Sequence, residues 1–379
     1  MAAAVLAKLY RGITKSRSKS FSQVLTKTEA VCVDGVTWKS MSIEISPENH
    51  LEDFKKYLLC SVRPEWEGRV LTSKSFDAGT TNALFAIYDK EKGMDADTVL
   101  IRINGNGTEN LICRKDEIVS LLCLHHHHLS PPMYAQLNNG MCYGFMTGRS
   151  IVAEELTNPV MMKKIVRALV KMHSLEMPTS FRGREPHVWY KSAQWLKLVP
   201  THFDEADKQR RLVESVGSID ELQHEMDEMK KELTFARSPV VFCHNDLTAG
   251  NIIYNEDKDE VGLIDFEYAG PNYLAFEIAN HFCEFAGVHD IDFSLYPTED
   301  VQKLWITAYL EESTRGPVSV SEVHDIYREV NKFTLSNHLF WTVWGVFQAQ
   351  NSSIDFDYIG YAGIRYSEYK KNKDKFLAL

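Results

Sequence analysis

The sequence predicts an α+β fold with two lobes, a small amino-terminal lobe rich in strands and a larger carboxy-terminal lobe made of helices. Short β-like apolar runs lie between residues 84 and 146, and long amphipathic helical patterns dominate after residue 150. The chain has 379 residues, which is enough for two lobes. Apolar residues make up 44% of it and charged residues 25%, an ordinary globular composition.

The composition also narrows the class of protein. The net charge is −10 and the pI is about 5.8, whereas a general nucleic-acid binder is usually basic. No run approaches 18 apolar residues, which argues against a membrane-spanning helix. The seven cysteines are scattered and contain no C-x-x-C pair. We therefore expect no disulfide framework, no Cys-based zinc site and a reducing compartment.

The first 28 residues differ from the rest of the chain. They contain six basic and no acidic side chains, with many serine and small apolar residues. A mitochondrial transit peptide has this composition, and so does a solvated tail. We expect a flexible basic segment over residues 1–40 of a cytosolic protein, with mitochondrial targeting as the alternative.

The small lobe is predicted over residues 41–148. Its first helix carries Leu51, Phe54 and Leu58 at helical spacing. Asn138-Asn139-Gly140 is a hairpin-turn signal. In chain order we expect a helix, two strands, a helix, a hairpin turn and a strand, over residues 43–62, 84–88, 99–103, 112–124, 138–140 and 141–146.

The large lobe is predicted over residues 149–379. Its helices are indicated by apolar stripes over residues 161–172, 219–233, 301–308 and 323–333. The second stripe is preceded by the capping box Ser218-x-x-Glu221. Short apolar runs at 240–242, 252–254 and 261–264 interrupt the helices and are followed by polar residues.

The segment that carries chemistry is VVFCHNDLTAGNIIYNEDKDEVGLIDFEY, residues 240–268. Its H-x-D-x-x-x-x-N spacing matches the protein-kinase catalytic loop, and I-D-F-E stands where D-F-G would be. Phosphoryl transfer needs a carboxylate for the attacking hydroxyl and hard oxygen ligands for Mg²⁺. This predicts Asp246 as the base and Asn251 and Asp265 as Mg²⁺ ligands, with Glu267 assisting a second metal or fixing the loop. The alternative is that these residues only form turns.

On this interpretation the small lobe holds ATP. The segment Phe76–Asn82 precedes a strand but contains one glycine and no G-x-G-x-x-G pattern, so a plain hairpin turn is the alternative. Arg102 stands where kinases place the strand lysine for the phosphates. Glu117, on the next helix, is its natural ion-pair partner. The alternative for Arg102 is a solvent-facing side chain.

Together these residues resemble the choline/ethanolamine kinase family, from about Phe76 to the carboxy terminus. The strongest matches are HNDLTAGNIIY…HFCEFAG over residues 244–287 and SNHLFWTVWGVFQAQNSSIDFDYIGYAGIR over residues 336–365. The runs EYAGPNYLAFEIANHFCEFAGV (267–288) and NNGMCYGFMTG (138–148) resemble the ethanolamine branch more than the choline branch.

The resemblance implies a two-lobed eukaryotic protein-kinase-like fold. It also implies that ATP and Mg²⁺ are used to phosphorylate the hydroxyl of ethanolamine, the first step of the cytidine-diphosphate route to phosphatidylethanolamine. Choline, or both alcohols, is the alternative substrate. The family's base falls on Asp246 and its metal ligands on Asn251 and Asp265, with Glu267 beside them as the further metal candidate. The ATP site falls on Asp77, Ala78, Gly79, Thr80, Thr81, Asn82, Ala83, Arg102, Glu117, Tyr143, Gly144, Phe145, Met146, Thr147, Gly148, Arg149 and Thr248.

The substrate cation needs carboxylates, aromatic faces or both. The candidates are Glu284, Trp341 and Trp344, and the two tryptophans are three apart on a helical pattern. Core packing is the alternative for the tryptophans, and the resemblance favours the substrate pocket, where Asp246 also contacts the substrate. A primary ammonium donates hydrogen bonds that a trimethylammonium cannot, so unpaired acceptors favour ethanolamine.

The sequence departs from the family in the nucleotide loop. Ethanolamine kinases commonly read D-G-x-T-N-K there, and this chain has Ala83 in place of the lysine. A nucleotide-binding scaffold without catalysis is therefore an alternative, as is an aminoglycoside-phosphotransferase-like kinase. We expect small-molecule substrates, no nucleic acid and no stable membrane insertion, and we leave a homodimer open as the assembly.

Overall fold

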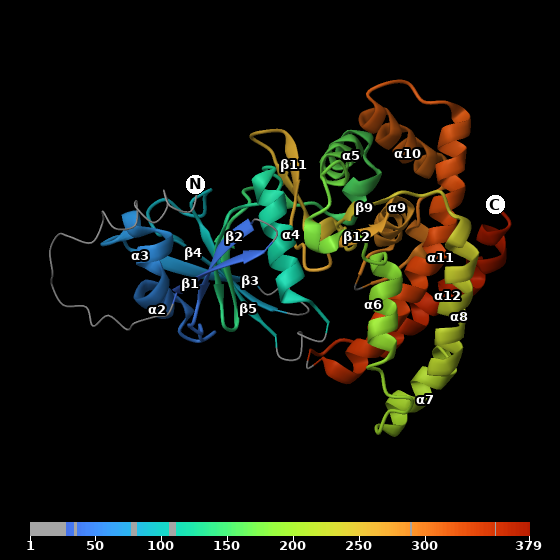
Figure 1. The fold of residues 1–379 in the computed structure, drawn as a ribbon, viewed down its shortest axis with the longest axis horizontal. Helices are drawn as coiled ribbons and strands as arrows, with labels where there is room; N and C mark the ends of the chain where they lie inside the picture. The colour runs from blue at the N-terminus through green and yellow to red at the C-terminus, as the bar shows by residue number, and fades with distance from the viewer. Residues whose placement is uncertain (1–27, 34–35, 77–81, 106–110, 289, 353) are drawn as a thin grey trace.

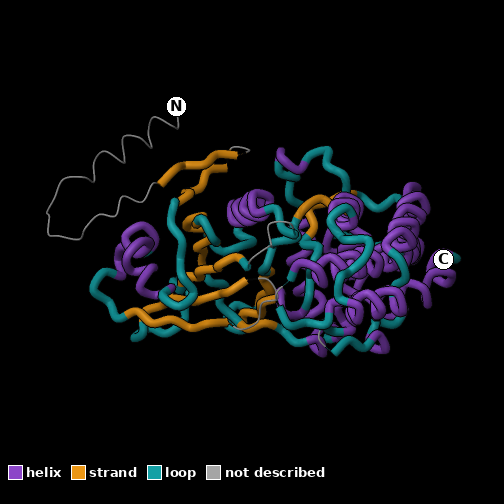
Figure 2. The backbone as a smooth tube through the Cα atoms, turned by 90° about the horizontal axis from the view of Figure 1, so that it is seen from below, coloured by secondary structure: helices purple, strands orange, loops and turns teal. Residues whose placement is uncertain are grey.

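The computed structural model describes residues 28–33, 36–76, 82–105, 111–288, 290–352 and 354–379. Figure 1 shows two lobes side by side, and Figure 2 shows that the strands gather in one lobe and most helices in the other. This confirms the predicted α+β architecture. Within the described ranges, no helix is both long and apolar enough to cross a bilayer.

The small lobe is built on a twisted sheet whose described strands run in the order β1-β2-β6-β7-β5-β4-β3. Neighbouring strands are antiparallel except β2 and β6, which are parallel. The predicted strands at 84–88 and 99–103 are confirmed, and the strand expected at 141–146 ends at Gly144. The strands are β1 (Thr28–Val33), β2 (Val36–Met41), β3 (Leu71–Phe76), β4 (Asn82–Asp89), β5 (Val99–Asn104), β6 (Met133–Leu137) and β7 (Gly140–Gly144).

Two features of the small lobe differ from expectation. Strands β1 and β2 occupy residues 28–41, most of which we had assigned to a basic tail. The helix predicted over 43–62 begins at His50 and runs as α2 (His50–Asp53), a π-helical turn (Phe54–Leu58) and α3 (Leu59–Val62). Ile43 and Ile45 are both buried with an alternating pattern, which is that of extended chain. Helix α4 (Arg114–His126) confirms the second predicted helix within two residues at each end.

The large lobe is organised around the long helix α11, which packs against α12, α9, α6 and α10. The apolar stripes predicted over 161–172 and 219–233 are buried, and the Ser218–Glu221 capping box is present. One stripe residue, Leu304, is 48% exposed because it faces away from the core. The helices are α5 (Pro159–His173), α6 (His187–Leu196), α7 (Ala206–Ser215), α8 (Ile219–Glu232), α9 (Leu274–Cys283), α10 (Glu299–Thr314), α11 (Val320–Asn351) and α12 (Tyr358–Leu377).

Short strands position the motif loops between the lobes. Strand β10 pairs with β11 and with β8, and β9 pairs with β12. The three short apolar runs of the sequence correspond to β9, β10 and β11. These strands are β8 (Arg149–Ser150), β9 (Val240–Cys243), β10 (Ile252–Asn255), β11 (Glu260–Leu263) and β12 (Gly270–Tyr273). The 3₁₀ turns are Pro64–Trp66, Ala153–Thr157, Thr179–Phe181, Leu233–Phe235, Ala249–Asn251, Glu284–Ala286 and Phe293–Leu295.

Candidate active site

Two loops bring the predicted catalytic residues together. One follows β9 and carries Asp246 and Asn251, and the other follows β11 and carries Asp265. The His244 Nε2–H donates to the carbonyl of Ile264 over 2.8 Å, and the amide of Ile264 donates to the carbonyl of Asn251 over 3.0 Å. These two bonds join the loops, so the three polar side chains lie at neighbouring strand ends.

The Asn251 carboxamide is oriented by Asp246. Its Nδ2 donates to the backbone carbonyl of Asp246 over 2.8 Å and lies 3.4 Å from the Asp246 Oδ2. Because the nitrogen is directed at Asp246, the carboxamide oxygen is the atom that remains for a cation. The amide therefore both fixes the Asp246 carboxylate and offers a hard oxygen ligand.

The backbone is constrained at both loops. Asn245 has φ 66° and Asp265 has φ 64°, in the left-handed region that side chains seldom adopt. Asn245 is held there by its Nδ2, which donates to the carbonyl of Tyr268 over 2.9 Å, and by its backbone amide, which donates to Glu277 Oε2 over 2.9 Å. Such strain persists only where the surroundings impose it, and here it aims the neighbouring carboxylates.

A buried cluster supports the catalytic loop from behind. The ligand-type atoms of His173, Cys243 and Glu277 lie within 4.8 Å of one another. Glu277 already accepts the Asn245 amide, and His173 Nδ1 lies 2.9 Å from the Tyr309 hydroxyl. The full burial of Glu277 raises its pKa to about 7. We interpret the cluster as a support that fixes β9 and the residues leading to Asp246.

Several carboxylates converge on the space between the lobes. Burial among protein atoms, and then the charges of Glu284, Glu267 and Glu277, raise the pKa of Asp246 well above its ordinary value. Asp265 is open to solvent in the cleft but crowded by protein, and this raises its pKa to about 6. Desolvation, followed by the charge of Asp265, raises the pKa of Glu267 to about 7. Mutually repelling carboxylates beside a free carboxamide oxygen are the donor set that divalent cations prefer, so these residues fit Mg²⁺.

On the small-lobe side, a buried arginine offers donors for phosphate. Arg102 Nη1 lies 2.5 Å from Glu117 Oε1, and both side chains are more than nine-tenths buried. The remaining Arg102 atoms Nε and Nη2 find no hydrogen-bond partner among the described residues. Buried donors without partners are rare in folded proteins, which indicates that a ligand with acceptor oxygens belongs there.

An ion-pair network connects this arginine to the second motif loop. Arg114, on the first turn of α4, lies 3.0 Å from Glu117 Oε2 and 3.8 Å from Glu267 Oε2. Asn82 Nδ2 donates to the same Glu267 oxygen over 3.2 Å, and Arg114 Nη2 donates to Asn82 Oδ1 over 3.2 Å. Glu267 is thus held by two residues of the small lobe.

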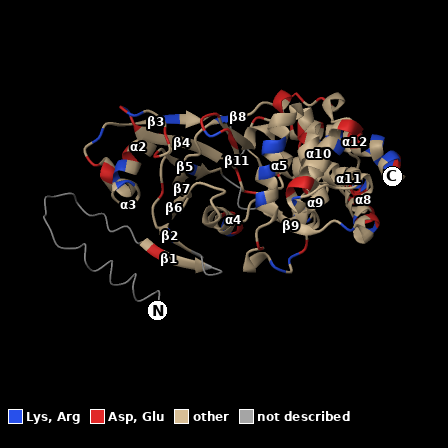
Figure 3. Ribbon diagram, turned by 90° about the horizontal axis from the view of Figure 1, so that it is seen from above, with Lys and Arg blue, Asp and Glu red and all other residues tan. Residues whose placement is uncertain are grey.

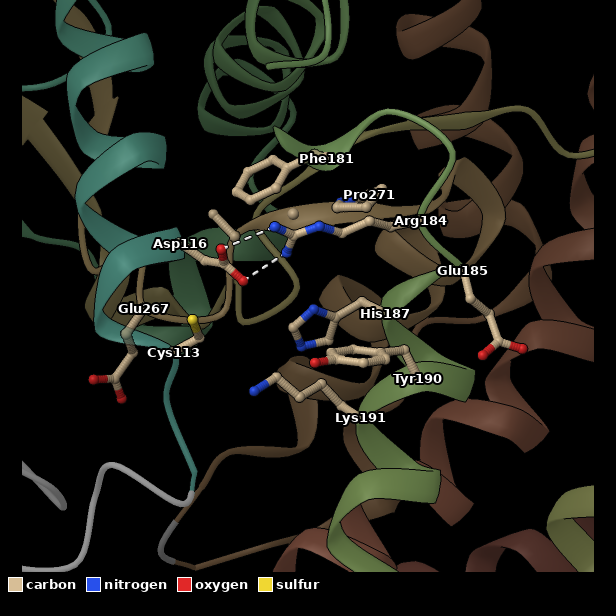
Figure 4. A pocket seen from close by; sticks show the side chains of 12 residues that line it. Cys113, Asp116, Phe181, Arg184, Glu185, His187, Tyr190, Lys191, Glu267 and Pro271 are labelled. Atoms are coloured by element: carbon tan, nitrogen blue, oxygen red, sulfur yellow. Dashed lines mark hydrogen bonds and ion pairs between the residues drawn. The ribbon is translucent and has the colours of Figure 1, made fainter. Parts of the chain in front are cut away.

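Further contacts fasten the amino-terminal end of α4 to the large lobe (Figure 4). The Nη1 and Nη2 atoms of Arg184 donate to the two carboxylate oxygens of Asp116, over 2.7 and 3.2 Å. Lys191 Nζ, on α6, donates to the carbonyl of Leu111 over 3.0 Å. A hollow of about 30 Å³ lies between these pairs. The helix that carries Glu117 is therefore held in place by both lobes.

The segment Tyr143–Arg149, here called the hinge, connects the lobes. The carbonyl and hydroxyl of Thr147 accept the Asn255 Nδ2–H over 3.1 and 2.9 Å, and Phe145 donates its amide to the carbonyl of Thr98 over 3.2 Å. Gly148 has φ 135°, and a Cβ there would lie 2.5 Å from the carbonyl oxygen of Tyr254. The guanidinium of Arg149 binds Glu155 and Glu256 at the surface instead of reaching the catalytic loops.

The other predicted nucleotide residues are placed as follows. Asn82 and Ala83 begin β4, next to β5 and Arg102. Thr248 donates its amide to the carbonyl of Asp246 over 3.0 Å, within the catalytic loop. The residues Asp77, Ala78, Gly79, Thr80 and Thr81 lie outside the described residues.

Four aromatic rings, here called the aromatic cage, lie beside the catalytic loops. The rings of Trp341 and Trp344 are 5.5 Å apart at 75°. Tyr268 lies 5.8 Å from Trp341, and Tyr361 lies 5.6 Å from Trp344. Trp344 donates its indole N–H to the Tyr268 hydroxyl over 2.9 Å. Since Tyr268 also accepts the Asn245 side chain, the cage is joined directly to the loop of Asp246.

The third predicted substrate residue, Glu284, lies in the same region. Burial raises its pKa to about 7, and the charge of Arg365 opposes that shift. Arg365 Nη1 lies 3.7 Å from Glu284 Oε1, which is beyond hydrogen-bond distance, so the carboxylate is not saturated by it. A chain of buried hydrogen bonds orients the cage. Arg365 donates to Asn337 Oδ1. Asn337 and Trp341 each donate to Asn280 Oδ1 over 2.7 Å.

The structure thus brings Asp246, Asn251, Asp265, Glu267, Glu284 and the two tryptophans into one region. The sequence analysis missed Arg114, Tyr268, Tyr361 and Arg365, which complete it. Arg114 precedes Glu117 by three residues on a helix, a spacing that signals an ion pair. The two tyrosines and Arg365 lack such a signal, because their roles depend on tertiary packing.

The sequence and the fold are similar to those of known kinases. A family model described as choline/ethanolamine kinase matches residues 74–370. Ethanolamine kinase 1 of Mus musculus is 39% identical over 344 residues, covering 89% of this chain and 94% of that protein. A solved structure of an ethanolamine kinase from Plasmodium vivax has a TM-score of 0.74 at 26% identity, covering 86% of this chain and 89% of that one. A choline kinase from Cryptosporidium parvum shares the fold, with a TM-score of 0.67 at 23% identity.

Proposed function

The chain belongs to the choline/ethanolamine kinase family, and we propose that it transfers the γ-phosphoryl group of ATP to the hydroxyl of ethanolamine. The observation that carries this proposal is the link between the loop of Asp246 and the aromatic cage. Asn245, next to Asp246, donates to the carbonyl of Tyr268, and the Tyr268 hydroxyl accepts the indole N–H of Trp344. With the ammonium group of ethanolamine held in the aromatic cage, its hydroxyl, two carbons away, would lie next to the Asp246 carboxylate. The product would be phosphoethanolamine, which begins the cytidine-diphosphate route to phosphatidylethanolamine.

In the proposed mechanism Asp246 orients the substrate hydroxyl and accepts its proton as the phosphoryl group is transferred. Its raised pKa makes it a stronger proton acceptor than an exposed aspartate, and Asn251 fixes its orientation. Asn251, Asp265 and Glu267 would hold Mg²⁺, which supplies charge neutralisation for the phosphates when bound. Arg102 would donate from Nε and Nη2, which find no partner among the described residues, to phosphate oxygens.

The preference for ethanolamine is supported by the chemistry of the cage. Aromatic faces attract any organic cation, including a trimethylammonium. A primary ammonium in addition donates hydrogen bonds, and Glu284 offers a buried carboxylate that Arg365 leaves unsaturated. Leaving such an acceptor unpaired is costly, so choline should bind less well. Choline kinase activity remains the second candidate, since the aromatic faces alone would accept it.

We also propose a cytosolic setting. All seven cysteines are free thiols, three of them exposed, which suits a reducing compartment.

The test is product identification by ³¹P NMR with MgATP and ethanolamine, comparing the wild-type chain with Asp246→Asn. We expect a phosphoethanolamine signal from the wild type and a kcat lower by about 10²–10⁴-fold in the variant, the usual effect of losing a general base. Asp257→Asn, an exposed turn residue, is the matched control and should retain the wild-type rate. Near-full activity of a folded Asp246→Asn would contradict the mechanism. MgATP binding without turnover of any alcohol would support the scaffold alternative.

A further inference from the structure

A cavity of about 250 Å³ lies behind the hinge, outside the catalytic region. It is lined by the carboxy-terminal end of α4, by α5 and by β10 and β11. Of these elements, β11 and α5 are in contact and lie near the top of the view in Figure 1. Asp246, Asn251, Asp265 and Arg102 do not line it. Among the predicted nucleotide residues that the structure describes, only Met146 and Thr147 line it, so we call it the hinge-back cavity.

The rim of the hinge-back cavity is cationic although the whole chain carries a net charge of −10. Lys164, Arg167 and Lys171 come from α5, where spacings of three and four residues place them on one face. Lys258 faces them from the β10–β11 turn, and the lining carboxylates are Asp259 and Glu260. Figure 3 shows basic segments along α5.

Two of these cations have no counter-ion within the described part of the chain. Lys164 pairs with Asp259 at 2.6 Å, and Arg167 lies 3.7 Å from Glu312. Neither Lys171 nor Lys258 makes an ion pair or a side-chain hydrogen bond to a described residue. The rim therefore holds two ammonium groups that can bind an anion without breaking an existing pair.

The floor of the hinge-back cavity is apolar. Leu124, Met172, Leu263 and Phe266 line it and are each less than a tenth exposed, and Leu129 is half-buried. An apolar floor under a cationic rim is complementary to a molecule with an apolar body and one anionic group. A bare inorganic anion would leave the floor hydrated, so the charge and the shape together favour an amphiphile.

We propose that the hinge-back cavity is a second binding site, for a small amphiphilic anion such as an organic phosphate or carboxylate. Its anionic group would lie on Lys171 and Lys258, and its apolar body on Leu124 and Phe266. Phe266 directly follows Asp265, and Met146 and Thr147 belong to the hinge, so occupancy of the cavity would reach both the metal loop and the inter-lobe connection. This site is additional to the proposed kinase activity and does not depend on it.

The test is isothermal titration of the full chain with 1-naphthyl phosphate in saturating MgADP, which keeps the probe out of the nucleotide site. We expect saturable binding of one probe per chain and about tenfold weaker binding by Lys171→Glu, the effect of losing one charge-assisted hydrogen bond. Lys258→Glu should act in the same way. Lys163→Glu, an exposed neighbour on α5 that does not line the cavity, should bind within twofold of the wild type.

Three outcomes would overturn the proposal. The first is the absence of saturable binding. The second is equal weakening by Lys163→Glu and Lys171→Glu, which would indicate a general charge effect. The third is inorganic phosphate binding as tightly as the naphthyl ester, which would remove the role of the apolar floor.

Discussion

At the scale of single residues, some charged groups of the site are fully paired and others are not. Glu117 is saturated by two arginines, whereas the Nε and Nη2 atoms of Arg102 find no hydrogen-bond partner in the described part of the chain. Asp265 is exposed to solvent and Asp246 is partly exposed. Buried groups that are fully paired stabilise the fold only weakly, and those left incomplete indicate ligands. This contrast separates Glu117, which is fully paired, from the residues proposed to bind ligands.

The saturation of Glu117 gives a stability prediction. Glu117→Ala would leave Arg102 buried without its carboxylate, which costs about 3–5 kcal/mol when one partner of a buried pair is removed. We expect urea unfolding at a lower midpoint with an unchanged slope. The double variant Glu117→Ala with Arg102→Met should recover part of the loss, and a single variant as stable as the wild type would show that the pair is not desolvated.

The raised pKa of Glu284 predicts a pH dependence of substrate binding. Its pKa of about 7 lies above the ordinary 4.5, so the carboxyl group becomes neutral as the pH falls below 7 and no longer attracts the ammonium group. We expect the KM for ethanolamine to rise about tenfold per pH unit below 7, with the KM for ATP much less affected.

The matched variant for this prediction is Glu284→Gln, which keeps the side-chain shape. It should have a high KM for ethanolamine at every pH, without the rise below 7. Equal increases in the KM values for ethanolamine and ATP would show that Glu284 acts on the fold and not on the substrate.

At the scale of elements, the sequence predicts the helices and strands whose hydrophobic pattern repeats within a short segment. The stripes of α5 and α8 and the strands β4 and β5 follow from periodicity, and the catalytic loop follows from the H-x-D-x-x-x-x-N spacing. Strand β3 reads LTSKSF and is not indicated by the sequence, because its four central residues are polar and show no apolar alternation. The helix predicted over 43–62 begins only at His50, because its helical spacing starts at Leu51 while the buried Ile43 and Ile45 alternate as in extended chain. Tyr268 and Arg365 could not be predicted, because their contacts join segments distant in the chain.

Helix α4 yields a prediction about how the lobes cooperate. Arg114 holds Glu267 and Asn82 from the first turn of this helix, so Arg114→Gln should loosen a proposed metal ligand without touching the cage. We expect about a 10–100-fold lower kcat, the usual loss for a residue that orients a metal ligand, and a KM for ethanolamine within twofold of the wild type. Mn²⁺ binding measured by equilibrium dialysis with ADP should weaken in parallel.

Arg114→Lys and Lys115→Gln are the comparison variants. The lysine keeps the charge and should recover part of the rate, and Lys115 is an exposed neighbour whose substitution should change neither measurement. Unchanged Mn²⁺ binding in a folded Arg114→Gln would contradict this role.

At the scale of the whole molecule, each lobe contributes different residues to the proposed site. The small lobe presents Arg102 and Asn82, the large lobe presents the catalytic loops and the cage, and α4 is fastened to both. The contacts Asp116–Arg184 and Lys191–Leu111 hold the amino-terminal end of α4, the helix that carries Glu117, the ion-pair partner of Arg102.

A direct competition between ethanolamine and choline tests whether this molecule is an ethanolamine kinase. Ethanolamine and choline at equal concentration are incubated with the wild-type chain and limiting MgATP, and both phosphorylated products are counted. We predict at least about tenfold more phosphoethanolamine, since the Glu284 carboxylate is paired only by the primary ammonium. An excess of phosphocholine, or the same product ratio from Glu284→Gln as from the wild type, would contradict the account.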